Sequence, residues 1–137
     1  MADLKISQLT AVTTPLALTE ELPTVQSSTT KKVTVQQMLT GVIVTEATTA
    51  RTLSASDNGK IIYCTSGSAT TITCAAGLNV GFNCTIIQGG AGKVTVAAGG
   101  QTLVSYSSLF STMGQYAVIS LVAPVANTFV AAGNLGV

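Results

Sequence analysis

From Val94 to Val137 the chain contains no Asp, Glu, Lys or Arg. Only 8% of its 137 residues are charged, against about 25% in an ordinary soluble domain. A free-standing domain needs a charged surface, because an uncharged and apolar surface promotes association. No segment is apolar over the ~20 residues that a membrane helix needs. The composition therefore predicts a domain whose surface is covered by other protein, most simply by further copies of the same chain.

The residue composition favours strands over helices. The chain is 47% hydrophobic but only 4% aromatic, and Val, Ile, Leu and Ala stand beside abundant Thr, Ser and Gly. β-Branched residues favour strands, and clusters of Gly and Ser mark the turns between them. Turn signals every ~8–12 residues are typical of a sandwich or barrel. We expect an all-β fold, specifically an antiparallel β-sandwich or barrel-like domain, with strands at 51–54, 60–65, 70–75, 82–88, 93–96, 102–104, 116–122 and 128–131.

The N-terminal part of the chain differs from the rest. Pro15 and Pro23 disfavour helix at the residues that precede them. The spaced apolar residues Leu4, Ile6 and Leu9 lie in an otherwise polar segment that is too short to form a core. We therefore expect an extended N-terminal arm up to about residue 30, whose apolar side chains contact another chain.

A small hairpin and one short helical turn are expected to follow the start of the arm. The segments 22–26 and 31–35 have strand-like sequences separated by Ser and Thr residues. Thr34 and Gln37 then have the spacing of a capping box, and Gly41 can end the turn. The predicted domains are therefore 1–45 for the arm, hairpin and helical turn, and 46–137 for the β-domain, in which Gly89–Gly92 is expected to form a hairpin turn.

The sequence contains no recognisable catalytic, cofactor or metal site. It has no His, which excludes a Ser-His-Asp triad, a Cys-His pair and a His-ligated metal. The acidic residues are scattered, and Asp57 is interpreted as a turn residue. Cys64, Cys74 and Cys84 are spaced by ten without the close pairs of a zinc site, so we interpret them as small buried hydrophobes. We predict that the protein is not an enzyme and binds no cofactor or small-molecule substrate.

Nucleic acid and membranes are not expected as partners. The formal net charge is +1, which gives no electrostatic footprint for nucleic acid. The first residues lack the apolar core of a signal peptide, so synthesis in a cytoplasm is expected.

Two stretches resemble structural proteins of tailed-bacteriophage virions. The first combines Lys5–Thr10 with Glu21–Gln26 and Thr30–Val35, which are similar to a "KIS-L" start followed by an "LP-VQ…TKK-T" hairpin. The second resembles a β-domain of phage fibres and head-attached appendages; it comprises Arg51–Leu53, Asp57–Lys60, Gly81–Gln88 and Gly114–Val118. The resemblance implies a trimeric, non-enzymatic virion component, assembled in the host bacterial cytoplasm.

The first interpretation is a homotrimeric capsid decoration, or cement, protein that binds the major capsid protein at the capsid surface and stabilises the head. Its predicted capsid-anchoring residues are Leu4, Ile6 and Leu9. Its predicted oligomer interface lies in the uncharged C-terminal strands, at Val118, Leu121, Val122 and Phe129. One alternative is a small head or tail fibre or adaptor protein involved in host attachment, and another is a small enzyme with an unfamiliar site.

Overall fold

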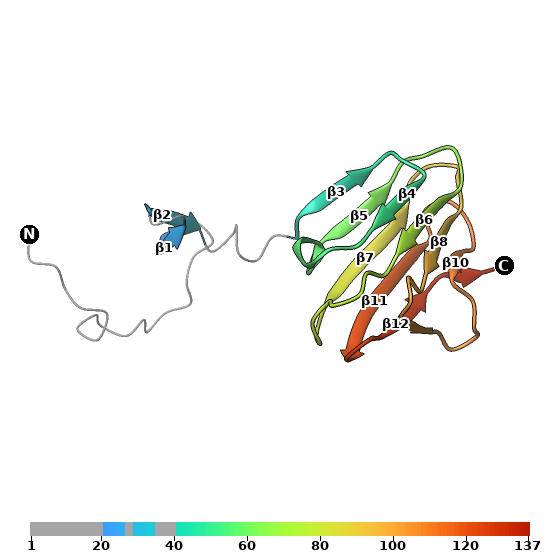
Figure 1. Ribbon diagram of the computed structural model, residues 1–137. Helices are drawn as coiled ribbons and strands as arrows, with labels where there is room; N and C mark the ends of the chain where they lie inside the picture. The colour runs from blue at the N-terminus through green and yellow to red at the C-terminus, as the bar shows by residue number, and fades with distance from the viewer. Residues whose placement is uncertain (1–20, 27–28, 35–40) are drawn as a thin grey trace, which may run out of the picture. The chain divides into compact units, whose positions relative to one another are not determined.

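The computed structural model describes residues 21–26, 29–34 and 41–137, and the chain divides into two compact units, Met1–Thr40 and Gly41–Val137 (Figure 1). In the first unit, β1 (Glu21–Gln26) and β2 (Thr29–Thr34) pair antiparallel, which confirms the predicted hairpin. Residues 1–20 of the expected arm and the helical turn expected after Thr34 lie outside the described residues.

The second unit is all-β, as the composition predicts. A six-stranded sheet has the order β3-β5-β7-β11-β12-β9, and a five-stranded sheet has the order β13-β10-β8-β6-β4. The domain boundary expected between residues 45 and 46 lies within β3. The elements, in chain order, are β3 (Ile43–Glu46), β4 (Ala50–Thr52), the 3-10 helix η2 (Ala55–Asp57), β5 (Ile61–Cys64), β6 (Thr70–Thr73), β7 (Asn83–Gln88), β8 (Val94–Ala97), β9 (Thr102–Val104), β10 (Ser111–Thr112), β11 (Val118–Val125), β12 (Thr128–Gly133) and β13 (Leu135–Gly136).

The arrangement of these strands is solenoid-like and corrects the expected antiparallel sandwich. From β3 to β8 the chain alternates between the two sheets, so that β3, β5 and β7 pair parallel in one sheet and β4, β6 and β8 pair parallel in the other. Each pair of successive strands therefore forms one coil, and three coils stack side by side (Figure 1). The antiparallel strands β11 and β12 extend the first sheet, whereas β10 and β13 extend the second.

The turns between successive strands from β3 to β8 are corners of the solenoid, which is why the sandwich prediction was wrong. Gly89–Gly92 does not form a hairpin turn, because β7 and β8 belong to different sheets. This corner lies against the preceding one, where the amide of Gly92 donates to the carbonyl oxygen of Ser66 at 3.1 Å. A Cβ on Gly92 would lie 1.9 Å from the carbonyl oxygen of Ser68. Glycine is therefore required here for close backbone approach.

The core lies between the two sheets and is formed by alternate residues of each strand. Phe82 and Phe129 pack edge to face in it, with ring centroids 6.3 Å apart. The buried Thr112 of β10 donates to the amide oxygen of Gln88 in β7, and this hydrogen bond joins the two sheets. Other buried core residues are Leu53, Ile62, Ile72, Ile86, Val94, Val96, Ile119 and Leu121.

The stacking of corners predicts different outcomes for two glycine substitutions. Gly92→Ala should lower the free energy of unfolding by about 2 kcal/mol, because backbone must move to admit the methyl group. The matched control is Gly67→Ala in the adjacent corner, where a Cβ has no neighbour within 4 Å, so a change within about 0.5 kcal/mol is expected. Urea denaturation measures both values, and equal stabilities of the two variants would contradict the stacked-corner account.

Candidate functional site

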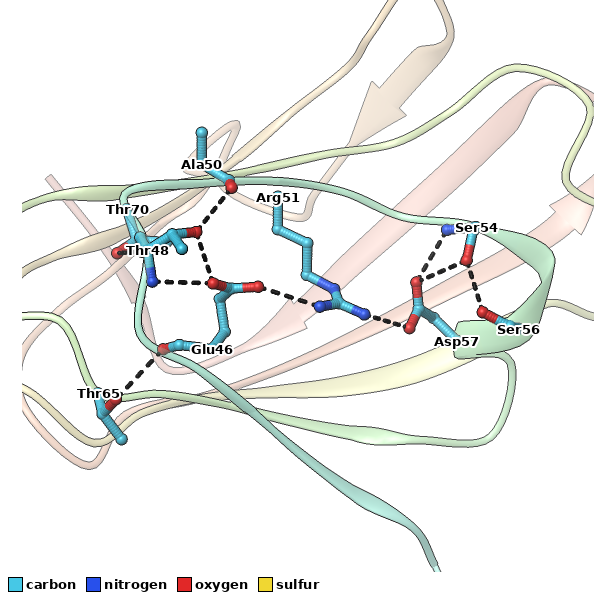
Figure 2. Close-up of polar contacts among 9 residues, drawn as sticks. All are labelled: Glu46, Thr48, Ala50, Arg51, Ser54, Ser56, Asp57, Thr65 and Thr70. Carbon is cyan, nitrogen blue, oxygen red and sulfur yellow. Dashed lines mark hydrogen bonds and ion pairs between the residues drawn. The ribbon is translucent and has the colours of Figure 1, made fainter.

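Three charged side chains meet in the first coil, between the end of β3 and the start of β5. The guanidinium of Arg51 donates from Nη1 to Glu46 Oε2 at 3.0 Å and from Nη2 to Asp57 Oδ1 at 2.6 Å. Figure 2 shows Arg51 lying between the two carboxylates. Glu46 and Asp57 are both buried in the domain. We refer to these three residues as the charged network.

The remaining carboxylate oxygens in the charged network are also hydrogen-bonded. Glu46 Oε1 accepts from the amide and the hydroxyl of Thr48, at 2.9 and 2.5 Å. Asp57 Oδ2 accepts from the amide and the hydroxyl of Ser54, at 2.9 and 3.1 Å. Every carboxylate oxygen therefore has a partner, as buried charges require.

The charged network covers the end of the core at the first coil. In the five-stranded sheet Arg51 is in register with Ile72 of the next coil, and in the six-stranded sheet Glu46 is in register with Cys64. Both neighbours are buried. The network thus occupies the level at which the following coils place apolar side chains, and it separates those side chains from solvent.

The pKa directions agree with a network that is ionised at neutral pH. Hydrogen bonds from Thr48, with a further contribution from Arg51, lower the pKa of Glu46 despite its burial. Burial alone would raise the pKa of Asp57, but the hydrogen bonds from Ser54 and Arg51 outweigh it and the pKa is lowered. A carboxylate whose pKa is lowered is a weak base at neutral pH, which disfavours proton abstraction from a substrate. The arrangement is suited to holding structure rather than to general base catalysis.

The three cysteines are buried free thiols, as the sequence analysis predicts. Burial raises the pKa of Cys64 and Cys74 to about 11 and that of Cys84 to about 12. A thiol with such a pKa carries almost no thiolate at neutral pH and is therefore a poor nucleophile and metal ligand. Within the described ranges, no group of three or more His, Cys, Asp or Glu side chains is placed to hold a metal ion.

The structure separates the four residues predicted at an oligomer interface. Val118 and Val122 of β11 are partly exposed on the outer surface of the six-stranded sheet. Leu121 and Phe129 are buried between the sheets, so their assignment to an interface needs correction. Strand alternation explains the difference, because successive side chains point to opposite faces. The predicted anchors Leu4, Ile6 and Leu9 lie outside the described residues.

The charged network was not predicted from the sequence, in which the acidic residues are scattered and Asp57 is interpreted as a turn residue. The available signal is the alternation of sign in Glu46, Arg51 and Asp57 within an otherwise uncharged stretch from Gly41 to Gly59. Their proximity depends on the corner between β3 and β4, which the strand pattern did not reveal.

No protein-family model matches the chain, and a search of curated proteins finds no significant match. Over residues 21–26, 29–34 and 41–137, no helix has the length and apolar character needed to cross a membrane.

The charged network predicts a pH-dependent loss of stability when its cation is removed. Arg51→Met should lower the free energy of unfolding at pH 7 by about 3 kcal/mol, because two buried carboxylates lose their partner. Because the pKa values of Glu46 and Asp57 are lower in the folded state, these residues stabilise the fold at pH values above their ordinary pKa values of 4.5 and 3.8. This contribution is lost as the pH falls through the lowered pKa values of the folded state. The difference in free energy of unfolding between the variant and the wild type should therefore become smaller in acid.

Denaturant titrations at neutral and acidic pH measure this effect. The control is Lys60→Met, which removes a cation outside the network and should change the stability by no more than about 0.5 kcal/mol. An Arg51→Met variant as stable as the control at pH 7 would show that the network does not hold the fold. A deficit that stays constant in acid would contradict the assigned pKa directions.

Proposed function

We propose that this protein is a structural component of a bacteriophage virion, and specifically a homotrimeric decoration protein of the capsid surface. The proposal is supported by the resemblance of residues 5–10, 21–26 and 30–35, and of the β-domain segments, to virion structural proteins. The described hairpin β1–β2 and the all-β second unit are compatible with that resemblance. In this role the protein acts by contact and not by catalysis.

The observation that carries the proposal is the scarcity of charge on the surface of the second unit. Residues 41–137 contain Glu46, Arg51, Asp57, Lys60 and Lys93 as their only charged side chains. The first three form the charged network, in which both carboxylates are buried. Two lysines are left to keep a domain of this size soluble, whereas separate domains depend on an abundantly charged surface. An assembly removes this difficulty by covering the uncharged surface with protein.

The proposed mechanism combines many weak contacts. Each copy contributes an N-terminal segment, with Leu4, Ile6 and Leu9 as its apolar anchors on the major capsid protein. Three such segments on one trimer bind as a multivalent ligand, because the second and third contacts form at a high effective concentration. The β-domains hold the three copies together.

A second candidate is a fibre or adaptor protein that contributes to host attachment. It is favoured by Tyr106 and Tyr116, whose side chains are exposed in loops of the β-domain. Tyr116 also has a φ of 67°, which is uncommon for a bulky residue and recurs at binding sites. Exposed aromatic rings suit the recognition of partners such as glycans.

The copy number in purified particles distinguishes the two candidates. A decoration protein covers the whole head, so we expect roughly one copy for each copy of the major capsid protein. Quantitative mass spectrometry of particles measures this ratio against the capsid protein as internal standard. A few copies per particle would favour the fibre, and absence of the protein from washed particles would contradict a virion role.

The anchoring role predicts that the N-terminal residues are needed for attachment. Removal of Met1–Leu9 should abolish binding to empty capsids while leaving the circular dichroism spectrum and the oligomeric mass unchanged. The matched control is the triple substitution of Lys5, Ser7 and Gln8 by Ala, which keeps the apolar anchors. Undiminished binding of the folded, truncated protein would refute the anchoring role of these residues.

A further inference from the structure

The two sheets of the second unit have outer surfaces of different chemistry. On the six-stranded sheet, apolar side chains point away from the core. Between 36% and 63% of Ile43, Val104, Val118, Val122 and Val130 is exposed, and Ile61, Tyr63 and Ile87 are partly exposed beside them. We refer to these eight residues as the apolar face. The other outward residues of this sheet are uncharged and include Thr45, Asn83, Thr85, Thr102, Ser120, Thr128 and Ala132.

The strand register arranges most of the apolar face in two rows, and the row between them holds Ile61, Thr85, Ser120 and Ala132. Tyr63, Ile87 and Val118 are direct neighbours across β5, β7 and β11. Val122, Val130 and Val104 form a second row across β11, β12 and β9. Figure 1 shows β5, β7, β11 and β12 side by side in one sheet. An uncharged sheet surface with this many exposed apolar side chains indicates an interaction site.

The outer surface of the five-stranded sheet carries hydroxyl groups instead. In register across β4, β6, β8 and β10, a row begins with Ala50 and continues with Thr71, Thr95 and Ser111. The hydroxyls of Thr95 and Ser111 lie 2.9 Å apart and form a hydrogen bond. Threonine and serine hydroxyls both donate and accept, so this surface can remain in water. The contrast indicates that one sheet faces a partner and the other faces solvent.

We propose that the apolar face binds a second copy of this chain. This inference rests on the self-association in the proposed function and names the surface responsible for it. An acidic or basic partner would gain nothing on a surface without charges and would lose the hydration of its own charged groups. The 41–137 unit of another copy offers the uncharged, β-branched surface that complements it. Three copies that each direct this face toward a common axis would cover it completely.

A pair of charge substitutions in the full chain tests the assignment. Val122→Asp places a carboxylate on the apolar face, and Thr71→Asp places the same group at an exposed position in a central strand of the other sheet. We expect Val122→Asp to sediment as a single chain with a wild-type circular dichroism spectrum. Thr71→Asp should keep the mass of the wild-type oligomer. Both variants place Asp in a strand and share its cost to folding. A difference between their oligomeric masses therefore shows which sheet surface takes part in association.

If Val122→Asp fails to fold, Val122→Thr replaces it, because it preserves the shape of the side chain and adds only a hydroxyl. Its dissociation constant should be roughly tenfold or more above that of the wild type, because a hydroxyl is buried without a partner.

Retention of the oligomer by a folded Val122→Asp, an unchanged constant for Val122→Thr, or dissociation of Thr71→Asp would overturn the assignment. A wild-type protein that sediments as one chain would also overturn it and leave residues 1–40 or a foreign protein as the occupant. Attachment of the variants to empty capsids is measured separately, so failure of the virion role is distinguishable from failure of this surface assignment.

Discussion

The charged network at the first coil is the interaction on which the rest of the domain depends. A stack of parallel coils has an end, and at β3 and β4 the described strands have no further coil beside them. Apolar side chains at that level would remain exposed, and isolated charges would be unsatisfied. Glu46, Arg51 and Asp57 occupy that level with charges that are paired, because Arg51 bridges both carboxylates and the carboxylates also receive hydrogen bonds from Thr48 and Ser54. The core then extends from Leu53, after β4, to Ile62 and Ile72 in the second coil.

The same network removes charge from the surface and so links the fold to the proposed role. With three of the five charged residues of the 41–137 unit committed to the network, the sheets present valine and isoleucine on one outer surface and threonine on the other. Apolar β-branched residues on a flat sheet gain free energy when another surface excludes water from them. The same placement of residues, with the charges paired in the network and the apolar side chains on an outer surface, therefore determines both the stability of the single domain and its association with other copies.

Much of the local structure was predictable, whereas its connectivity was not. The hairpin of β1 and β2 and the strands β5 to β9, β11 and β12 lie close to the segments expected from alternation and turn residues. The strand β3 was missed because Ile43–Glu46 is short and follows the predicted helical turn.

Glycine-rich segments such as Gly89–Gly92 indicate a change of chain direction, but the same residues occur both in hairpin turns and in the corners of a solenoid. Only the contact of Gly92 with the backbone of Ser66 and Ser68, made between residues far apart in sequence, distinguishes them. The assignment of Leu121 and Val122 to one interface has a different cause, because alternation along a strand by itself places adjacent side chains on opposite sides of the sheet.

The central claim is that the apolar face of this protein is covered by further copies of the same chain. Sedimentation equilibrium of the unmodified full-length chain, over a dilution series at micromolar concentration, tests it most directly. The account predicts a mass of three chains of 13.8 kDa each, without a soluble single-chain species at the upper concentrations. A stable and soluble single chain throughout the series would contradict it.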